Sequence, residues 1–147
     1  MKSMIVAITV AALVAGGSAG CSPDPPPAKP KRGTLPPGTA RLSIDGNDAG
    51  TTKSVECAAV GSRTTIRTGD DKSGVTVLLS NRAKLTVELV RIRNLNGFSG
   101  DYNLGLGDEA TAALTESTYH ISGTALGYRS PESIAVATQP FAIEVTC

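Results

Sequence analysis

Proline divides this chain into parts that fold by different rules. Seven of the nine prolines in the 147-residue chain lie between Pro23 and Pro37, and only Pro131 and Pro140 follow. Proline lacks the backbone N–H that a helix or an interior strand needs, so the crowded stretch predicts polyproline II or a solvated spacer. We therefore expect a leader over residues 1–20, a Pro-rich disordered linker over 21–40, and one folded domain over 41–147.

The leader has the pattern of a secretory signal peptide. Lys2 precedes an apolar run over residues 4–15, which is too short to span a bilayer as a helix and is typical of a signal-peptide h-region. Small residues follow and end at Gly20, directly before Cys21. This arrangement resembles the lipobox of bacterial lipoproteins, with Ser18 where an aliphatic residue is usual. It predicts cleavage between Gly20 and Cys21 and lipidation of Cys21; the alternative is ordinary secretion with a free or paired Cys21.

Lipidation would decide where the protein resides. Two or three acyl chains hold a protein on a membrane stably, and Cys21 of a bacterial lipoprotein would carry a diacylglyceryl group. The sequence contains no second apolar run of about 18 residues that would form a transmembrane helix. We therefore expect a lipid-anchored protein on the extracytoplasmic face of the cell membrane or envelope.

After the linker, short runs of β-branched and aliphatic residues alternate with Gly, Asn and Asp, which is typical of strands and turns. In the last seven residues, Phe141, Ile143, Val145 and Cys147 share one face. In the longest strand candidate, residues 84–92, the alternation slips by one residue, which predicts a β-bulge or a strand between two packed surfaces. The domain is predicted to be all-β: a small antiparallel β-sandwich or partly open barrel of about eight strands.

Two segments leave helix open as an alternative. Residues 110–116 fit a short helix or a hairpin arm, and Thr111 and Thr115 favour the hairpin arm. Ser130 and Pro131 resemble a helix N-cap and first helical position, which predicts one helical turn over residues 132–137.

Three cysteines are one too many for a secreted protein that pairs its thiols. If Cys21 carries lipid, Cys57 and Cys147 form an even pair in an oxidising compartment. A bond between them would close a loop of about 90 residues and fix the final strand. Because nothing resembles a CxxC motif, a structural disulfide is favoured over a redox or metal role.

The titratable residues offer little for catalysis. The 14 bases nearly balance the 13 acids, which argues against nucleic-acid binding. The single histidine, His120, is out of phase with Tyr119 and Ile121, so we expect it to face solvent, and no nucleophile elbow accompanies it. The loop over residues 97–109 has carboxylates that could bind calcium, but it lacks EF-hand spacing. We expect no enzyme, no metal and no cofactor.

Several motifs together identify a resemblance: Ile44-Asp45-Gly46, Ser54-Val55-x-Cys57, Leu95-Asn96-Gly97, the YHISGTA stretch over 119–125 and the FAIEVTC stretch over 141–147. With the cysteine and linker, they resemble the mycobacterial 19-kilodalton lipoprotein antigen (LpqH-like) family over essentially the whole chain. The resemblance implies a surface-exposed envelope lipoprotein antigen whose acylated N-terminus is recognised by a host pattern-recognition receptor, Toll-like receptor 2. It carries over no enzymatic activity.

Two points limit what the resemblance transfers. The family's best-known member has a Thr/Ser-rich, mannosylated linker, whereas this linker is rich in proline, so glycosylation is not carried over. The alternative function is an envelope lipid or glycolipid carrier, because a β-sandwich with few aromatic residues can enclose an aliphatic cavity. Against it, about 107 residues barely fill one core.

Overall fold

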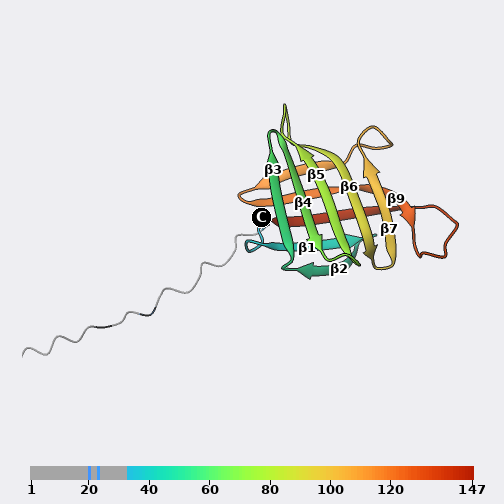
Figure 1. Cartoon of the computed structure of the whole chain (residues 1–147), viewed down its shortest axis with the longest axis horizontal. Helices are drawn as coiled ribbons and strands as arrows, with labels where there is room; N and C mark the ends of the chain where they lie inside the picture. The colour runs from blue at the N-terminus through green and yellow to red at the C-terminus, as the bar shows by residue number, and fades with distance from the viewer. Residues whose placement is uncertain (1–19, 21–22, 24–32) are drawn as a thin grey trace, which may run out of the picture.

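The computed structural model describes residues 20, 23 and 33–147, and within them it contains ten strands and no helix (Figure 1). The predicted leader, the lipidation site Cys21 and the linker up to residue 32 lie outside the described residues, apart from Gly20 and Pro23. The strands are β1 (Thr39–Ile44), β2 (Asn47–Thr52), β3 (Val55–Val60), β4 (Arg63–Gly69), β5 (Gly74–Ser80), β6 (Thr86–Leu95), β7 (Phe98–Asn103), β8 (Thr111–Thr115), β9 (Thr118–Tyr128) and β10 (Ala137–Thr146).

All strand pairs are antiparallel, in the order β2-β1-β10-β9-β7-β6-β5-β4-β3, with β8 paired to β9. The long strand β9 joins two layers, because its first residues pair with β8 and its last three pair with β7. In Figure 1 the strands β3 to β7 lie in front and run across the layer that contains β1, β9 and β10. The predicted fold class is confirmed as an antiparallel sheet nearly closed into a barrel, with ten strands instead of eight.

The two unpredicted strands are β2 and β7. The β2 sequence, NDAGTT, is mostly exposed and has no alternating apolar face, so nothing in its pattern marks a strand. In β7 the apolar alternation is carried by Phe98 and Tyr102, both buried, with Gly100 between them. Glycine is required there because a Cβ on Gly100 would lie 2.7 Å from Leu126 O and from the Phe98 ring.

Two hairpins close through mirror-image turns, as the Asp-Gly and Asn-Gly pairs predict. Asp45 and Gly46 have φ of 52° and 74°, and Asn96 and Gly97 have φ of 49° and 82°. Two-residue turns with both central residues at positive φ match the right-handed twist of the flanking strands. These turns set the register of β1 with β2 and of β6 with β7.

The predicted bulge is confirmed in β6. Leu78 of β5 pairs with Leu89, but the next residue, Leu79, pairs with Val87, so Glu88 is the extra residue. The bulge lets both Val87 and Val90 point into the core, where each is 0 % exposed. This is the one-residue slip visible in the sequence.

The core lies between the two layers and receives alternate residues from most strands. In β10 the side chains of Phe141, Ile143 and Val145 are buried, as predicted. The Tyr102 hydroxyl accepts a hydrogen bond from Ala110 N at 3.1 Å, and its ring meets Phe141 edge-on with centroids 6.4 Å apart. Further buried residues include Ile66, Val75, Val77, Leu79, Val90, Ile92, Leu95 and Ile121.

Of the two helix alternatives, the hairpin arm is confirmed and the helical turn is wrong. Residues 111–115 form β8, which pairs with β9. Residues 132–137 form no helix: Ser133 N donates to Ser130 O at 3.1 Å in an isolated turn, and Ser133 Oγ donates to Ala135 O. The reason is tertiary: β10 begins at Ala137, opposite Gly127 of β9. The residues between β9 and β10 therefore reverse the direction of the chain and do not form a helical turn.

Candidate functional site

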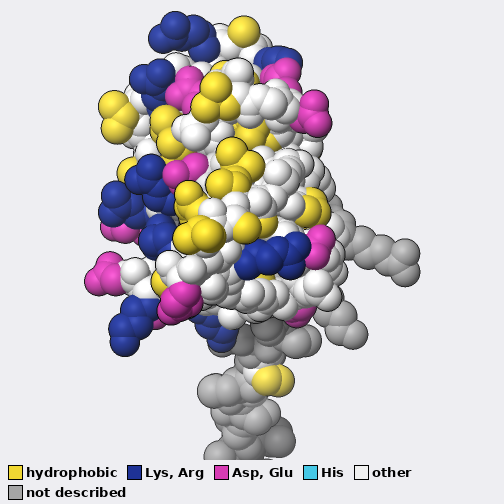
Figure 2. Space-filling model, turned by 90° about the vertical axis from the view of Figure 1, so that its right-hand side faces the viewer, with side chains coloured by type: hydrophobic (Ala, Val, Ile, Leu, Met, Phe, Trp, Pro, Cys, Tyr) yellow, Lys and Arg dark blue, Asp and Glu magenta, His cyan; other side chains and the backbone are white. Residues whose placement is uncertain are grey.

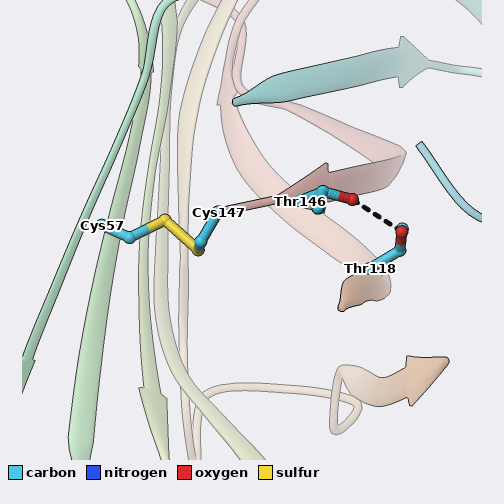
Figure 3. Close-up of a disulfide and its surroundings, with 4 residues drawn as sticks. All are labelled: Cys57, Thr118, Thr146 and Cys147. Atoms are coloured by element: carbon cyan, nitrogen blue, oxygen red, sulfur yellow. Dashed lines mark hydrogen bonds between the residues drawn. A yellow bond between two sulfur atoms is a disulfide. The ribbon is translucent and has the colours of Figure 1, made fainter. Parts of the chain in front are cut away.

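The predicted disulfide joins the two layers of the fold. Cys57 lies on β3, the last strand of the sheet order, and Cys147 follows β10; their Cα atoms are 5.9 Å apart and 90 residues separate them (Figure 3). Both cysteines are exposed, although each lies on the apolar face of its strand. The exposure of Cys57 follows from the position of β3 at an edge of the sheet, where no further strand of the described part of the chain covers it.

Beside the disulfide, the chain that leads toward Cys21 is fastened to the domain. Leu35 N donates to Thr118 Oγ1 at 3.0 Å, and Gly38 N donates to Thr146 O at 2.9 Å. The buried hydroxyls of Thr118 and Thr146 are themselves 2.6 Å apart (Figure 3). Strand β1 begins at Thr39, two residues before the domain start expected from the sequence. The N-terminal connection and the C-terminus therefore lie at the same side of the domain (Figure 1).

A groove of about 450 Å³ adjoins the disulfide. It lies between β3 and the β8–β9 hairpin, with Ala59, Leu114 and Tyr119 among its lining residues. Leu114 is 51 % exposed. The groove is open to solvent and is not part of the core.

His120 lies on the outer face of β9, as expected, but it is half-buried instead of fully exposed. Its side chain is 28 % exposed, and its Nδ1 lies 3.7 Å from Glu144 Oε1 on the neighbouring strand. Glu144 Oε2 also accepts from Arg41 at 3.0 Å. Gly33, in the segment before β1, lies near the ring: a Cβ added to it would be 4.0 Å from His120 Cε1. Sequence periodicity placed His120 on the outer face of β9 but could not show that this segment returns over that face.

This histidine does not complete a catalytic triad. A hollow of about 250 Å³ contains His120, Glu144 and Ser122, but the Ser122 hydroxyl is hydrogen-bonded to Thr111 Oγ1 at 2.9 Å. Nucleophilic catalysis needs a hydroxyl that is hydrogen-bonded to the base. Here a hydrogen bond to a neighbouring strand engages the hydroxyl, and Arg41 shares the carboxylate.

Two of the carboxylates of the glycine-rich loop, Asp101 and Glu109, have basic partners. Asp101 accepts from Arg91 Nε at 3.0 Å, and Glu109 lies 3.6 Å from Lys84 Nζ. Within residues 33–147, no group of three or more His, Cys, Asp or Glu side chains could hold a metal ion. These pairs lie on the surface, where ion pairs contribute little.

Asp70 is a turn residue, as the sequence predicts. In the loop between β4 and β5, its Oδ1 accepts from Ser73 N at 2.9 Å and from Lys72 N at 2.8 Å. The hydrogen bonds from Ser73 and Lys72 lower the pKa of the Asp70 carboxyl below its ordinary value, because they favour the charged form.

The side away from the connection exposes apolar side chains. Leu126, Tyr128, Ile134 and Val136 are 60 %, 47 %, 97 % and 56 % exposed; we call these four residues the distal patch. A groove of about 560 Å³ there is lined by Ser99, Tyr128, Ser130, Pro131, Ser133 and Ile134. Figure 2 looks onto this side and shows hydrophobic side chains near its centre, with Lys and Arg along one flank.

The sequence did not reveal the distal patch. Ile134 and Val136 fell within the expected helical turn, and their loop conformation depends on where β9 and β10 pair. The available signal was two large apolar residues close behind Ser130 and Pro131. Large exposed apolar residues that cluster are typical of interaction surfaces.

Together these features define a small disulfide-closed β-domain, attached at one side and apolar at the other, with no assembled catalytic or metal centre among the described residues. Residues 33–147 match the family described as the Mycobacterium 19 kDa lipoprotein antigen, and the chain belongs to that family.

Individual relatives agree with this assignment. Lipoprotein LpqH of Mycobacterium tuberculosis (strain H37Rv) is 30 % identical over 156 aligned residues, covering 99 % of this chain and 98 % of the relative. Lipoprotein LpqH of Mycobacterium avium is 32 % identical over 108 residues, covering 73 % and 67 %. Another relative, from Mycobacterium avium subsp. hominissuis (strain TH135), is 36 % identical over 110 residues, covering 74 % and 76 %. The predicted family is confirmed.

Proposed function

We propose that this protein is a surface-exposed lipoprotein antigen of the cell envelope, anchored by lipid on Cys21 after cleavage behind Gly20. Its acylated N-terminus is recognised by host Toll-like receptor 2. The family and the names of its relatives support a lipoprotein. Among the described residues, the structure contains no helix that is long and apolar enough to cross a membrane.

The observation that carries the proposal is the attachment of residues 35–38 beside the disulfide. The hydrogen bonds of Leu35 and Gly38 fix the exit of the N-terminal chain at the side that carries the C-terminus. Twelve residue steps separate Cys21 from Gly33, so even a fully extended chain spans at most about 40 Å. An anchor at Cys21 thus keeps the domain within about 40 Å of the membrane, attached at the side that carries the C-terminus.

Intact mass of the protein extracted from envelopes tests the anchor. We expect the leader to be absent and a diacylglyceryl adduct on Cys21, with a Cys21→Ala protein released in soluble form. Reporter cells that express Toll-like receptor 2 should respond to the native protein and not to the Cys21→Ala protein. Signalling that persists without lipid would contradict the receptor mechanism.

A matched control separates the lipid from the fold. The double variant Cys57→Ser/Cys147→Ser keeps Cys21 and should retain both the adduct and the receptor response. If instead it loses signalling while remaining acylated, the folded domain itself is part of what the receptor recognises, and the proposal in its present form fails.

The alternative, an envelope lipid or glycolipid carrier, has weaker support. The space between the layers is occupied by buried side chains such as Val77, Val90 and Ile143. The grooves of about 560 Å³ and 450 Å³ are open and lie at the surface. Native mass spectrometry that found a stoichiometric co-purifying lipid would favour the carrier.

A further inference from the structure

The sheet order ends in two strands whose outer edges have no partner among the described residues, β2 and β3. The edge at β2 is irregular: its register with β1 shifts between Leu42 and Ser43, and Gly50 has φ of 112°. Asp48 Oδ1 accepts from Gly50 N at 2.7 Å. Bulges, self-bonded backbone groups and lysines are the usual means of preventing strands from joining an edge.

The edge at β3 has none of these protections. Val55–Val60 pair with β4 without a register shift, and the strand VECAAV contains no Pro, Lys or Gly. Every residue from Glu56 to Val60 is exposed, and Val60 is 80 % exposed. A regular, exposed strand edge with small side chains is a template for another strand.

The register shows which backbone groups are available. Gly69 N donates to Ser54 O at 3.0 Å, and in an antiparallel ladder the bonded residues alternate. Glu56, Ala58 and Val60 therefore direct their N–H and C=O groups toward β4. The N–H and C=O groups of Cys57 and Ala59 point away from the sheet.

We propose that β3 pairs antiparallel with β3 of a second copy of this chain, about a two-fold axis at Ala58. In this register Cys57 lies opposite the partner's Ala59, so the outward backbone groups of both residues are bonded. The only charged side chain of the strand, Glu56, lies opposite the partner's Val60, whereas an axis at Glu56 would place two carboxylates face to face. The axis at Ala58 also keeps the two disulfides from lying directly opposite each other.

A second copy fits this edge for two further reasons. The groove with Leu114 and Ala59 borders the same edge, so an added strand covers apolar surface that is exposed in the single chain. The edge also lies at the side where the N-terminal connection enters (Figure 1). If both copies are lipid-anchored, which rests on the proposed function, confinement to one membrane raises their effective concentration. A single strand pair buries little area, so the dimer is weak and depends on density.

Residue-resolved hydrogen exchange on the full chain, purified with its native N-terminus in detergent, tests the pairing. Raising the ratio of protein to detergent should slow exchange at the Cys57 and Ala59 amides and leave Glu56, Ala58 and Val60 unchanged, because the latter already bond to β4. These alternate residues form an internal control. No change at Cys57 and Ala59 at any density, or association that protects β2 or the distal patch instead, overturns the proposal.

A pair of variants distinguishes backbone pairing at the β3 edge from non-specific association. Ala59→Pro removes an N–H that faces outward, which an edge strand tolerates, whereas Ala59→Thr keeps the donor and favours a strand. We expect Ala59→Pro to lower the association constant measured by sedimentation about tenfold or more, since the dimer loses a hydrogen bond at each of two sites; Ala59→Thr should associate like the native chain. Equal association of the two variants refutes edge pairing. Sedimentation does not require the lipid, so failure of the anchor is distinguishable from failure of the dimer.

Discussion

Removing the disulfide is the most quantitative perturbation that the fold offers. We consider the double variant Cys57→Ser/Cys147→Ser, in which serine is acceptable because both positions are exposed. The bond closes a loop with a sequence separation of 90 residues, and loop-closure entropy then assigns it roughly 4.6 kcal/mol at 25 °C. A domain of this size unfolds with an entropy of about 0.24 kcal/mol/K, so Tm should fall by roughly 19 °C.

The disulfide acts mainly by restricting the unfolded chain, so its removal should also change the denaturant dependence of unfolding. Without the cross-link the unfolded state expands and exposes more surface, so the urea m-value should rise as the midpoint falls. In the folded state the loss should be local. β3 touches the rest of the sheet through β4, so its amides should lose protection from hydrogen exchange before those of β5 and β6.

Urea and thermal unfolding, followed by circular dichroism, measure these quantities. Native protein reduced by dithiothreitol should unfold like the double variant, and Cys21→Ser should unfold like the native protein because Cys21 is not part of the pair. A loss below about 1 kcal/mol with an unchanged m-value would refute the entropic argument. It would mean that the β3–β4 hairpin stays in place through packing alone.

Three other perturbations follow from single contacts. Thr118→Val leaves the buried Thr146 hydroxyl without its 2.6 Å partner and Leu35 N without its acceptor, and it should lower the free energy of unfolding by about 1–3 kcal/mol; adding Thr146→Val should recover only the part of this loss that comes from the unpaired Thr146 hydroxyl. Because the pKa of Asp70 is lowered in the fold, its carboxylate stabilises the fold above the ordinary pKa of about 3.9, and this contribution is lost as pH falls through the lower folded pKa. Unfolding of Asp70→Asn and native protein should therefore differ at neutral pH and converge in strong acid. Gly127→Ala places a Cβ against the Ser99 backbone and should cost about 3 kcal/mol by overpacking, measured by urea denaturation.

The sequence predicts those parts of the fold that local chemistry dictates. The slip in alternation after Leu89 marks the bulge at Glu88 because side chains alternate faces strictly along a strand. The Asp45-Gly46 and Asn96-Gly97 turns are predictable because few residues adopt positive φ at low cost. By contrast, β2 is polar and exposed, and it is a strand only because β1 supplies a partner.

For the candidate site too, features set by local sequence could be predicted, and features set by distant contacts could not. The pairing of Cys57 with Cys147 followed from counting thiols, which requires no knowledge of where the strands lie. The cover over His120 and the exposure of Ile134 depend on contacts between segments far apart in the chain. Local pattern could place His120 on the correct strand face and still misjudge its burial.

The unprotected β3 edge explains why the disulfide lies where it does. In the sheet order β3 and β10 are far apart, so no ladder of backbone hydrogen bonds holds the free edge of the front layer to the layer behind it. The disulfide supplies that link at one point and leaves the outward N–H and C=O groups of β3 without a strand partner among residues 33–147. A fold that needed only stability could have covered this edge with a further strand. The regular, exposed edge of β3 is held in place by the disulfide. A strand of a second copy can therefore pair with it without unfolding β3.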